Sequence, residues 1–248
     1  MNRLTSLLVM CVVAVVVTAN GQRKPKPATS PAATATALPR GNNLKEGASQ
    51  SEKAAKVFAE IMGTPDKGIP EDLLNKAECV AVFPSVIKAG FIVGGKAGRG
   101  VASCRTPTGW SAPGFLEIKG GSVGLQVGGE ATDVVLLFMN TNGLKKLVNN
   151  KVELGADASI AAGPVGREAA ASTDASMSAE ILSYSRSKGL FAGISLKGSV
   201  VSPEKSDNEG TYGKGVSVLQ VLQAGKDRAP TEVRAFPNKL GEYSTRTA

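Results

Sequence analysis

The sequence predicts an α+β domain built mainly on an antiparallel, glycine-rich β-sheet or a partly closed barrel, with an N-terminal amphipathic helix and short packing helices. Two observations carry this prediction. Between residues 79 and 139, short apolar runs alternate with glycines, which is the pattern of closely spaced strands joined by turns. Before them, between residues 49 and 63, apolar side chains recur at helical spacing.

The first element is a helix that we expect to begin at Ser49 and to end at Gly63. Ser49 and Glu52 have the spacing of a capping box, in which each side chain accepts a hydrogen bond from the other residue's backbone N–H. The apolar face either packs on the core or lies on a membrane surface. A second short helix begins at Pro70 and runs to Lys76. The apolar face of the first helix consists of Ala54, Val57, Phe58, Ile61 and Met62.

The strands that follow are expected to be short, because glycines and one proline interrupt the apolar runs. Pro84 ends the first strand, glycine turns occupy residues 94–100, 120–121 and 128–129, and a corner lies at residues 110–113. We expect the strands at residues 80–83, 90–93, 101–104, 115–118, 123–127 and 133–139.

The C-terminal half is expected to contain one more helix and one hairpin. Thr141 caps a short helix, and residues 180–201 form a hairpin with its turn at residues 187–189. Residues 226–248 are polar and punctuated by prolines, which favours a flexible tail.

The N-terminus has the pattern of an export signal. Arg3 precedes an apolar run that is shorter than the roughly 20 residues of a membrane-spanning helix, and Ala19 provides a small residue for cleavage. A retained anchor is the alternative. We expect an exported protein, periplasmic or extracellular and peripheral on a membrane. The expected organisation is a signal peptide over residues 1–19, a disordered Pro/Ala/Thr-rich linker over 20–45, a globular domain over 46–225 and the flexible tail over 226–248.

Charge and histidine content exclude several function classes. Much of the net charge of +8 lies in residues 1–45, which hold no acidic residue, so overall basicity does not indicate a nucleic-acid partner. The chain has no histidine, which removes the usual general base and the commonest metal ligand. Ser85 and Lys88 spell S-x-x-K and residues 206–208 spell S-D-N, but no K-T-G accompanies them. We expect no enzyme, no cofactor and no metal.

Two cysteines remain once the leader is removed. Cys79 and Cys104 either form a disulfide in an oxidising compartment or stay as buried free thiols. The sequence leaves both alternatives open.

Four segments resemble the SYLF domain, also called the Ysc84 actin-binding-protein domain. They are AECVAVFPSVIKAGFIVGGKAGRGVASCR, GWSAPGFLEIKGGSVGLQVGGEATDVVLLFMN, LGADASIAAGPVGR and YSRSKGLFAGISLKGS, and the resemblance spans roughly residues 51–215. Relatives of this kind are membrane-associated and bind phosphoinositides, so the resemblance implies lipid binding. With its leader, the chain is similar to the bacterial, exported branch, for which other anionic phospholipids are the expected ligands. Actin is not expected as a partner.

The resemblance and the basic clusters together predict binding to an anionic phospholipid surface. Lys88, Lys96 and Arg99 flank the glycine-rich turns, where backbone N–H groups can also meet phosphate oxygens. Arg186 and Lys188 bracket the tip of the predicted hairpin. A cell-envelope structural or protein-interaction domain, with a protein partner and no lipid ligand, is the alternative. The first helix adds Lys53 and Lys56 near the headgroups and Phe58 as an inserting side chain.

Overall fold

The computed structural model describes residues 38–64, 68–140, 142, 151–166, 178–187 and 189–246, with the backbone alone for residues 90–93 and 122–129. All of them belong to one compact unit, Ala35–Ala248. The class is α+β, with an eight-stranded, mostly antiparallel sheet and short helices around it, as the sequence predicts. Among the described residues, no helix combines the length and the apolar character that are needed to cross a membrane.

Helix α1 spans Leu44–Met62 and α2 spans Glu71–Lys76. The end of α1 at Gly63 is as expected, but its start is not, because Ser49 lies inside the helix. The helix begins at Leu44, five residues before the predicted start, because its first turn packs on the rest of the domain. A Cβ atom on Gly47 would lie 2.4 Å from the Thr211 hydroxyl, so only glycine permits this close approach.

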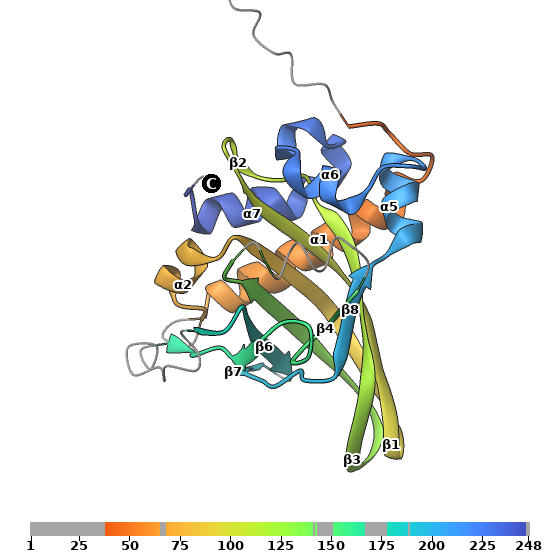
Figure 1. Ribbon diagram of the computed structural model, residues 1–248, viewed down its shortest axis with the longest axis vertical. Helices are drawn as coiled ribbons and strands as arrows, with labels where there is room; N and C mark the ends of the chain where they lie inside the picture. Colours follow the sequence, from red (N-terminus) through yellow and green to blue (C-terminus); the bar gives the residue numbers. More distant parts are fainter. Residues whose placement is uncertain are drawn as a thin grey trace, which may run out of the picture. The chain divides into compact units, whose positions relative to one another are not determined.

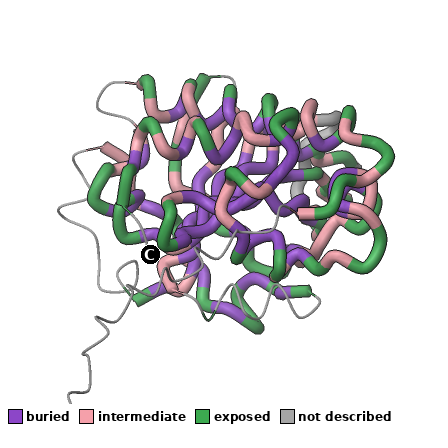
Figure 2. The backbone as a smooth tube through the Cα atoms, turned by 90° about the horizontal axis from the view of Figure 1, so that it is seen from above, coloured by how far each residue is buried: buried purple, intermediate pink, exposed green. Residues whose placement is uncertain are grey.

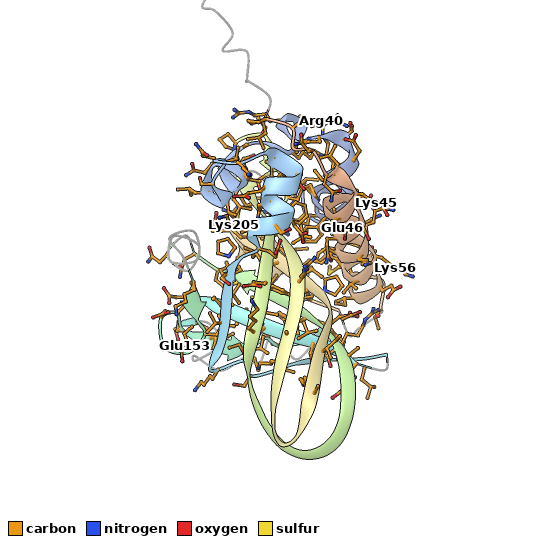
Figure 3. All side chains as sticks on the ribbon, turned by 90° about the vertical axis from the view of Figure 1, so that its right-hand side faces the viewer. Arg40, Lys45, Glu46, Lys56, Glu153 and Lys205 are labelled. Carbon is orange, nitrogen blue, oxygen red and sulfur yellow. A yellow bond between two sulfur atoms is a disulfide. The ribbon has the colours of Figure 1, made fainter. Side chains whose placement is uncertain are left out.

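Two long strands dominate the sheet. Strand β1 spans Cys79–Thr106, β3 spans Gly114–Phe138, and they pair antiparallel over almost their whole lengths. Both strands turn back on themselves, so that β1 lies as a narrow U inside the wider U of β3 (Figures 1 and 3). The prediction of six short strands is therefore wrong, because the apolar runs and the glycines between them form two continuous strands. Between them, β2 (Gly109–Trp110) folds back on the end of β1 at the expected corner.

The bend of this ribbon explains its one large irregularity in pairing. Gly90 pairs with Gly128, and the next pair toward the other arm is Ile92 with Gly124. One residue of β1 therefore spans the same bend as three residues of β3. An outer strand follows a longer path around a turn than an inner one, so β3, the outer strand, has the extra residues at the bend.

Glycines let the two arms of β1 approach each other. A Cβ atom on Gly98 would lie 2.8 Å from Val86 Cγ2, and one on Gly100 would lie 2.4 Å from Phe83 Cδ1. Such distances are too short for real carbon contacts, so glycine is required here. The prediction of a turn at residues 94–100 is therefore wrong. The glycines of this segment lie within β1 and allow its two arms to pack closely.

The expected end of the first strand, at Pro84, is a β-bulge instead. The pairing of β1 with β3 shifts between Phe83 and Val86, so that Pro84 and Ser85 face a single residue of β3. Ser85 adopts a φ of 55°, and its backbone N–H donates to Asp133 Oδ1 at 2.9 Å. The strand continues past Pro84 because the bulge accommodates the missing N–H of proline.

The rest of the sheet flanks the ribbon. One arm of β3 pairs with β6, which forms the predicted hairpin with β7 and also pairs in parallel with β5; the other arm pairs with β8, which pairs with β4. The predicted helix after Thr141 lies almost wholly outside the described residues. The bounds are β4 Val152–Glu153, β5 Ile160–Ala162, β6 Ile181–Ser187, β7 Leu190–Gly193 and β8 Ser199–Pro203.

Hydrophobic cores lie on both faces of the sheet. Val80 and Val82 pack in one core with α1, α2 and α7, whereas Ala81 and Phe83 pack in the other, between the strands of the curled sheet. Alternate residues of a strand point to opposite faces, so an unbroken apolar run is what a strand covered on both sides requires. The buried residues occupy the middle of the domain and the exposed residues its outside (Figure 2).

Residues 226–243 contain short helices packed on the domain, so the prediction of a flexible tail over 226–248 is wrong for this segment. Phe236 and Leu240 of α7 are fully buried, and the Phe236 ring meets Phe58 of α1 edge to face at a centroid distance of 6.2 Å. Because polar residues separate the apolar ones in these short helices, the sequence shows no long run of apolar residues at helical spacing. The elements are α5 Lys205–Tyr212, α6 Val218–Gln223, η2 Lys226–Arg228, η3 Thr231–Val233 and α7 Ala235–Tyr243.

A disulfide between Cys79 and Cys104 joins the two ends of β1. Next to it, the Arg105 backbone N–H donates to the Glu78 carbonyl at 2.7 Å. Of the two alternatives for the cysteines, the structure has the disulfide, and it closes the base of the ribbon.

Candidate functional site

Two lysines meet across the arms of β1, between the bulge and the bend. Because Gly98 lies against Val86, the next inward-facing positions toward the bend are Lys96 and Lys88. Burial lowers the pKa of Lys96, and the positive charge of Lys88 lowers it further. Both side chains are partly buried, and neither forms an ion pair with any residue that the structure describes. We call Lys88 and Lys96 the lysine pair.

A glycine makes room for the lysine pair. Gly120 of β3 pairs with Lys96, and a Cβ atom on Gly120 would lie 2.9 Å from Lys96 Cε. The lysine stem therefore lies across the bare backbone of the neighbouring strand. The sequence predicted Gly120 to be a turn residue. Its position in the pair Gly120–Gly121 was the one sequence feature that marked it, and that feature does not indicate that it makes room for Lys96.

The lysine pair is chemically suited to an anion with several oxygen atoms. Two ammonium groups within electrostatic reach of each other repel, and an anion between them relieves that repulsion. Ile87, which precedes Lys88 in the strand and therefore faces the opposite side of the ribbon, is apolar and 57% exposed. A ribbon that carries these cations on one face and an exposed apolar side chain on the other, at the same level, fits an interface between water and lipid better than it fits bulk water.

Arg99 has a different environment. Its guanidinium lies 3.6 Å from Asp207 Oδ1, and Asp207 is only 4% exposed. Burial raises the pKa of Asp207 most strongly, the charge of Glu204 raises it further, and Arg99 opposes this shift. The charge of Arg99 is thus partly offset by a buried carboxyl group.

Arg186 does not belong with the lysine pair. Its guanidinium donates to Asp133 Oδ2 at 2.7 Å and also pairs with Glu60 of α1. Asp133 in turn holds the backbone of Ser85 in the bulge. Arg186 therefore ties the helix, the sheet and the bulge together. Lys188, the other expected residue of the hairpin tip, lies outside the described residues.

The α1 residues separate into two faces. Phe58 is fully buried against Phe236 and Tyr243, so the core-packing interpretation of this face is the one that the structure has. Lys53 and Lys56 are exposed, and Figure 3 shows Lys56 on the outer side of the helix. Acidic residues share that outer face, so it carries mixed charge; among them are Glu46, Glu52 and Glu60.

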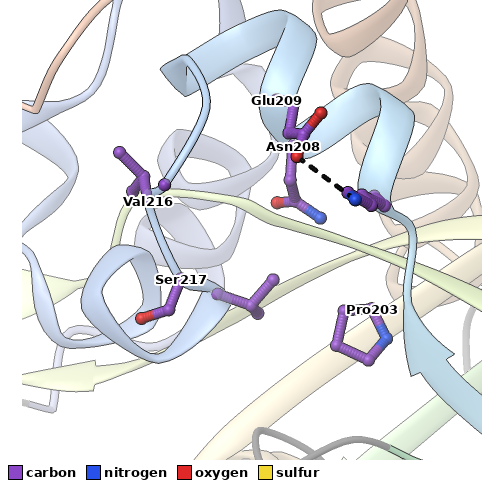
Figure 4. A pocket seen from close by; sticks show the side chains of 8 residues that line it. Pro203, Asn208, Glu209, Val216 and Ser217 are labelled. Atoms are coloured by element: carbon purple, nitrogen blue, oxygen red, sulfur yellow. Dashed lines mark ion pairs between the residues drawn. The ribbon is translucent and has the colours of Figure 1, made fainter.

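A surface hollow of about 450 Å³ lies at the other end of the domain, between the end of β8, α5 and α6 (Figure 4). Its polar groups already serve local structure. The Asn208 amide donates to the Phe115 and Glu204 carbonyls, the Ser217 hydroxyl caps α6, and Lys205 pairs with Glu209 at 3.7 Å. The hollow therefore offers no set of converging, unengaged polar groups.

Comparison with known proteins identifies similar chains. Residues 119–243 match the family model Ysc84, described as "Las17-binding protein actin regulator". LAS seventeen-binding protein 3 of Saccharomyces cerevisiae is 37% identical over 195 residues, which are 75% of this chain and 42% of the yeast protein. SH3 domain-containing YSC84-like protein 1 of Xenopus laevis is 35% identical over 210 residues, which are 82% of this chain and 62% of the frog protein.

The human SH3 domain-containing YSC84-like protein 1 is 35% identical over 185 residues, or 73% of this chain and 54% of the human protein. The chain thus spans about half the length of the relatives that it matches. Their names describe binding and a domain content, and none of them describes a reaction.

Proposed function

Since the chain belongs to the Ysc84 family, whose domain is also called SYLF, we propose that it is a non-catalytic module that binds anionic phospholipid at a membrane surface. The observation that carries this proposal is the lysine pair: two ammonium groups at the strand ribbon that form no ion pair with any described residue, at the same level as the exposed Ile87. A lysine near an anionic membrane contributes about 1 kcal/mol of binding free energy. Two such residues change the membrane affinity by roughly 30-fold.

The test is co-sedimentation of the full chain with phosphatidylcholine vesicles that either contain or lack phosphatidylglycerol, at low and at high salt. We expect binding that requires phosphatidylglycerol and weakens as salt rises, because screening acts on exposed charges. Absence of binding in every condition would contradict the proposal.

A matched pair of variants locates the surface. Lys88→Glu with Lys96→Glu should abolish vesicle binding, whereas Lys53→Glu with Lys56→Glu should bind like the wild type. Both double variants change the net charge equally, so a general electrostatic effect would weaken them equally and would sink the assignment to the lysine pair. Urea midpoints measured without lipid control for folding, because Lys88→Glu places a second acid opposite Glu130.

The second candidate function is binding to a protein partner, which the family's description as an actin regulator favours. The expectation that actin is not a partner stays a prediction. Co-sedimentation with filamentous actin, in the absence of lipid, decides it. Actin binding that the lysine-pair variant retains would establish a separate protein-binding surface.

We also propose export of the chain, supported by the leader-like N-terminus and by the disulfide between Cys79 and Cys104, which an oxidising compartment favours. The relatives named above are eukaryotic, so membership in a bacterial branch stays a prediction. Fractionation of cells that express the full chain tests export: we expect a shortened product outside the cytoplasm, and an uncleaved cytoplasmic product would contradict it.

A further inference from the structure

The bend of the β1–β3 ribbon carries no charged residue. Residues 89–95 of β1 and 120–129 of β3 consist of glycine, alanine and apolar residues, with Ser122 and Gln126 as the only others. We call these two segments the charge-free tip. Charged residues begin immediately on each side of it: Lys88 and Lys96 on β1, Lys119 and Glu130 on β3. A boundary this sharp, set by strand register, separates an apolar end of the ribbon from a charged base.

The charge-free tip projects from the domain. Figures 1 and 3 show the bend at the end of the ribbon, away from α5, α6 and α7. The backbone through the tip remains paired as strand on both sides of the bend, from Gly90 opposite Gly128 to Val93 opposite Val123. Pairing lowers the cost of moving backbone N–H and C=O groups out of water. A paired ribbon end is therefore a better element for entering a lipid interface than an irregular loop is.

The distances match the outer layer of a bilayer. The strand from Lys96 to Ile92 is about 13 Å long at the usual rise per residue. An element that lies at the interface enters the boundary between headgroups and acyl chains by about 5–10 Å. With the lysine pair at the level of the phosphates, the bend thus reaches that boundary and stops short of the bilayer centre. The exposed Ile87 then lies at the same level as the lysines.

We propose that the charge-free tip inserts into the outer leaflet of the membrane, with Lys88 and Lys96 holding the headgroup phosphates at its base. This inference rests on the proposed lipid binding and adds to it a wedge that penetrates the surface. Charge alone brings the domain to the membrane, and burial of the apolar tip retains it there.

The experiment places a fluorescent reporter at the bend of the full chain. The native Trp110 is buried and hydrogen-bonded, so it gives a constant background. Leu125→Trp adds a tryptophan on the outer strand of the bend, and Gln223→Trp adds one at an exposed position of α6, at the other end of the domain (Figure 1). Each variant is mixed with phosphatidylcholine and phosphatidylglycerol vesicles whose acyl chains are brominated, because bromine quenches tryptophan only at close range.

We expect the emission of Leu125→Trp to shift to shorter wavelengths and to be quenched, and the emission of Gln223→Trp to do neither. A protein that sediments with vesicles while Leu125→Trp stays unquenched would overturn insertion and leave the proposed function intact. A protein that does not sediment with vesicles would overturn both.

A second variant tests retention separately from attraction. Leu125→Asp leaves the lysine pair in place, so salt-sensitive attraction should persist, while the partition coefficient should fall about tenfold from the loss of one buried apolar side chain. The urea midpoint without lipid reports whether the variant is folded. A folded Leu125→Asp variant that binds vesicles as tightly as the wild type would refute insertion.

Discussion

The guanidinium of Arg105 stacks on the ring of Trp110 with 3.8 Å between its central carbon and the ring centroid. The same guanidinium donates to the Leu74 carbonyl at 3.1 Å and to the Ser244 hydroxyl at 2.6 Å, and Trp110 Nε1 donates to the Ser244 carbonyl at 3.0 Å. One buried cation thus joins α2, the sheet and the residues after α7. The hydrogen bonds of this guanidinium go to carbonyl and hydroxyl oxygens, and the carboxylate of Glu78 acts on it through its charge.

Replacing Arg105 by lysine should lower the free energy of unfolding by about 3 kcal/mol, because a single ammonium cannot reach all of these acceptors and leaves some of them buried and unpaired. Urea denaturation measures the change. The control is Arg40→Lys, an exposed arginine paired with Glu232, for which we expect less than about 0.5 kcal/mol. Equal effects of the two substitutions would show that the carbonyl cage around Arg105 contributes little.

Gly100→Ala should destabilise the domain by about 3 kcal/mol, because the new methyl group meets the Phe83 ring and the Val82 carbonyl at less than contact distance. Gly121→Ala is the matched control, since a Cβ atom there has nothing within 4 Å. Thermal or urea unfolding compares the two. If both glycines tolerate alanine equally, the arms of β1 do not pack as closely as described.

These glycines also mark the limit of what the sequence predicts. Helical spacing located α1, and short apolar runs located the buried parts of the strands, because each depends on neighbours in the chain. The nesting of β1 in β3 depends on contacts between residues far apart, such as Gly100 with Phe83, and local patterns gave these glycines the appearance of turns. The same limit applies to the site: Lys88 and Lys96 were named from local charge, whereas the partners of Arg186 on α1 and β3 had no local signal.

Asp207→Asn should make stability less dependent on pH. Its raised pKa means that the folded state binds a proton more readily than the unfolded state, so wild-type stability falls as pH rises from the ordinary aspartate value through the raised one. At neutral pH the variant should therefore be more stable, by about 1 kcal/mol, and the gain should vanish in acid. Urea midpoints at neutral and acidic pH measure this, with the exposed Asp72→Asn as control. A variant that is less stable at neutral pH would show that the pair with Arg99 outweighs burial.

Arg186→Gln should lower the stability of the domain without changing its affinity for vesicles. The loss of its pairs with Asp133 and Glu60 should lower the free energy of unfolding by about 2 kcal/mol, because Asp133 keeps a partly buried charge without its partner. Vesicle binding of the folded variant should match the wild type, since this guanidinium is already engaged. A large loss of vesicle affinity at unchanged stability would return Arg186 to the lipid surface, where the sequence alone had placed it.

The disulfide lies at the base of the ribbon, as do both hydrophobic cores, while the bend lies at the far end. Substitutions in the bend therefore disturb little of the core. Chains with the same base can change the sequence of the bend, and with it the surface that the bend binds, at low cost to folding. The bend of one such chain should accordingly be transferable to the base of another.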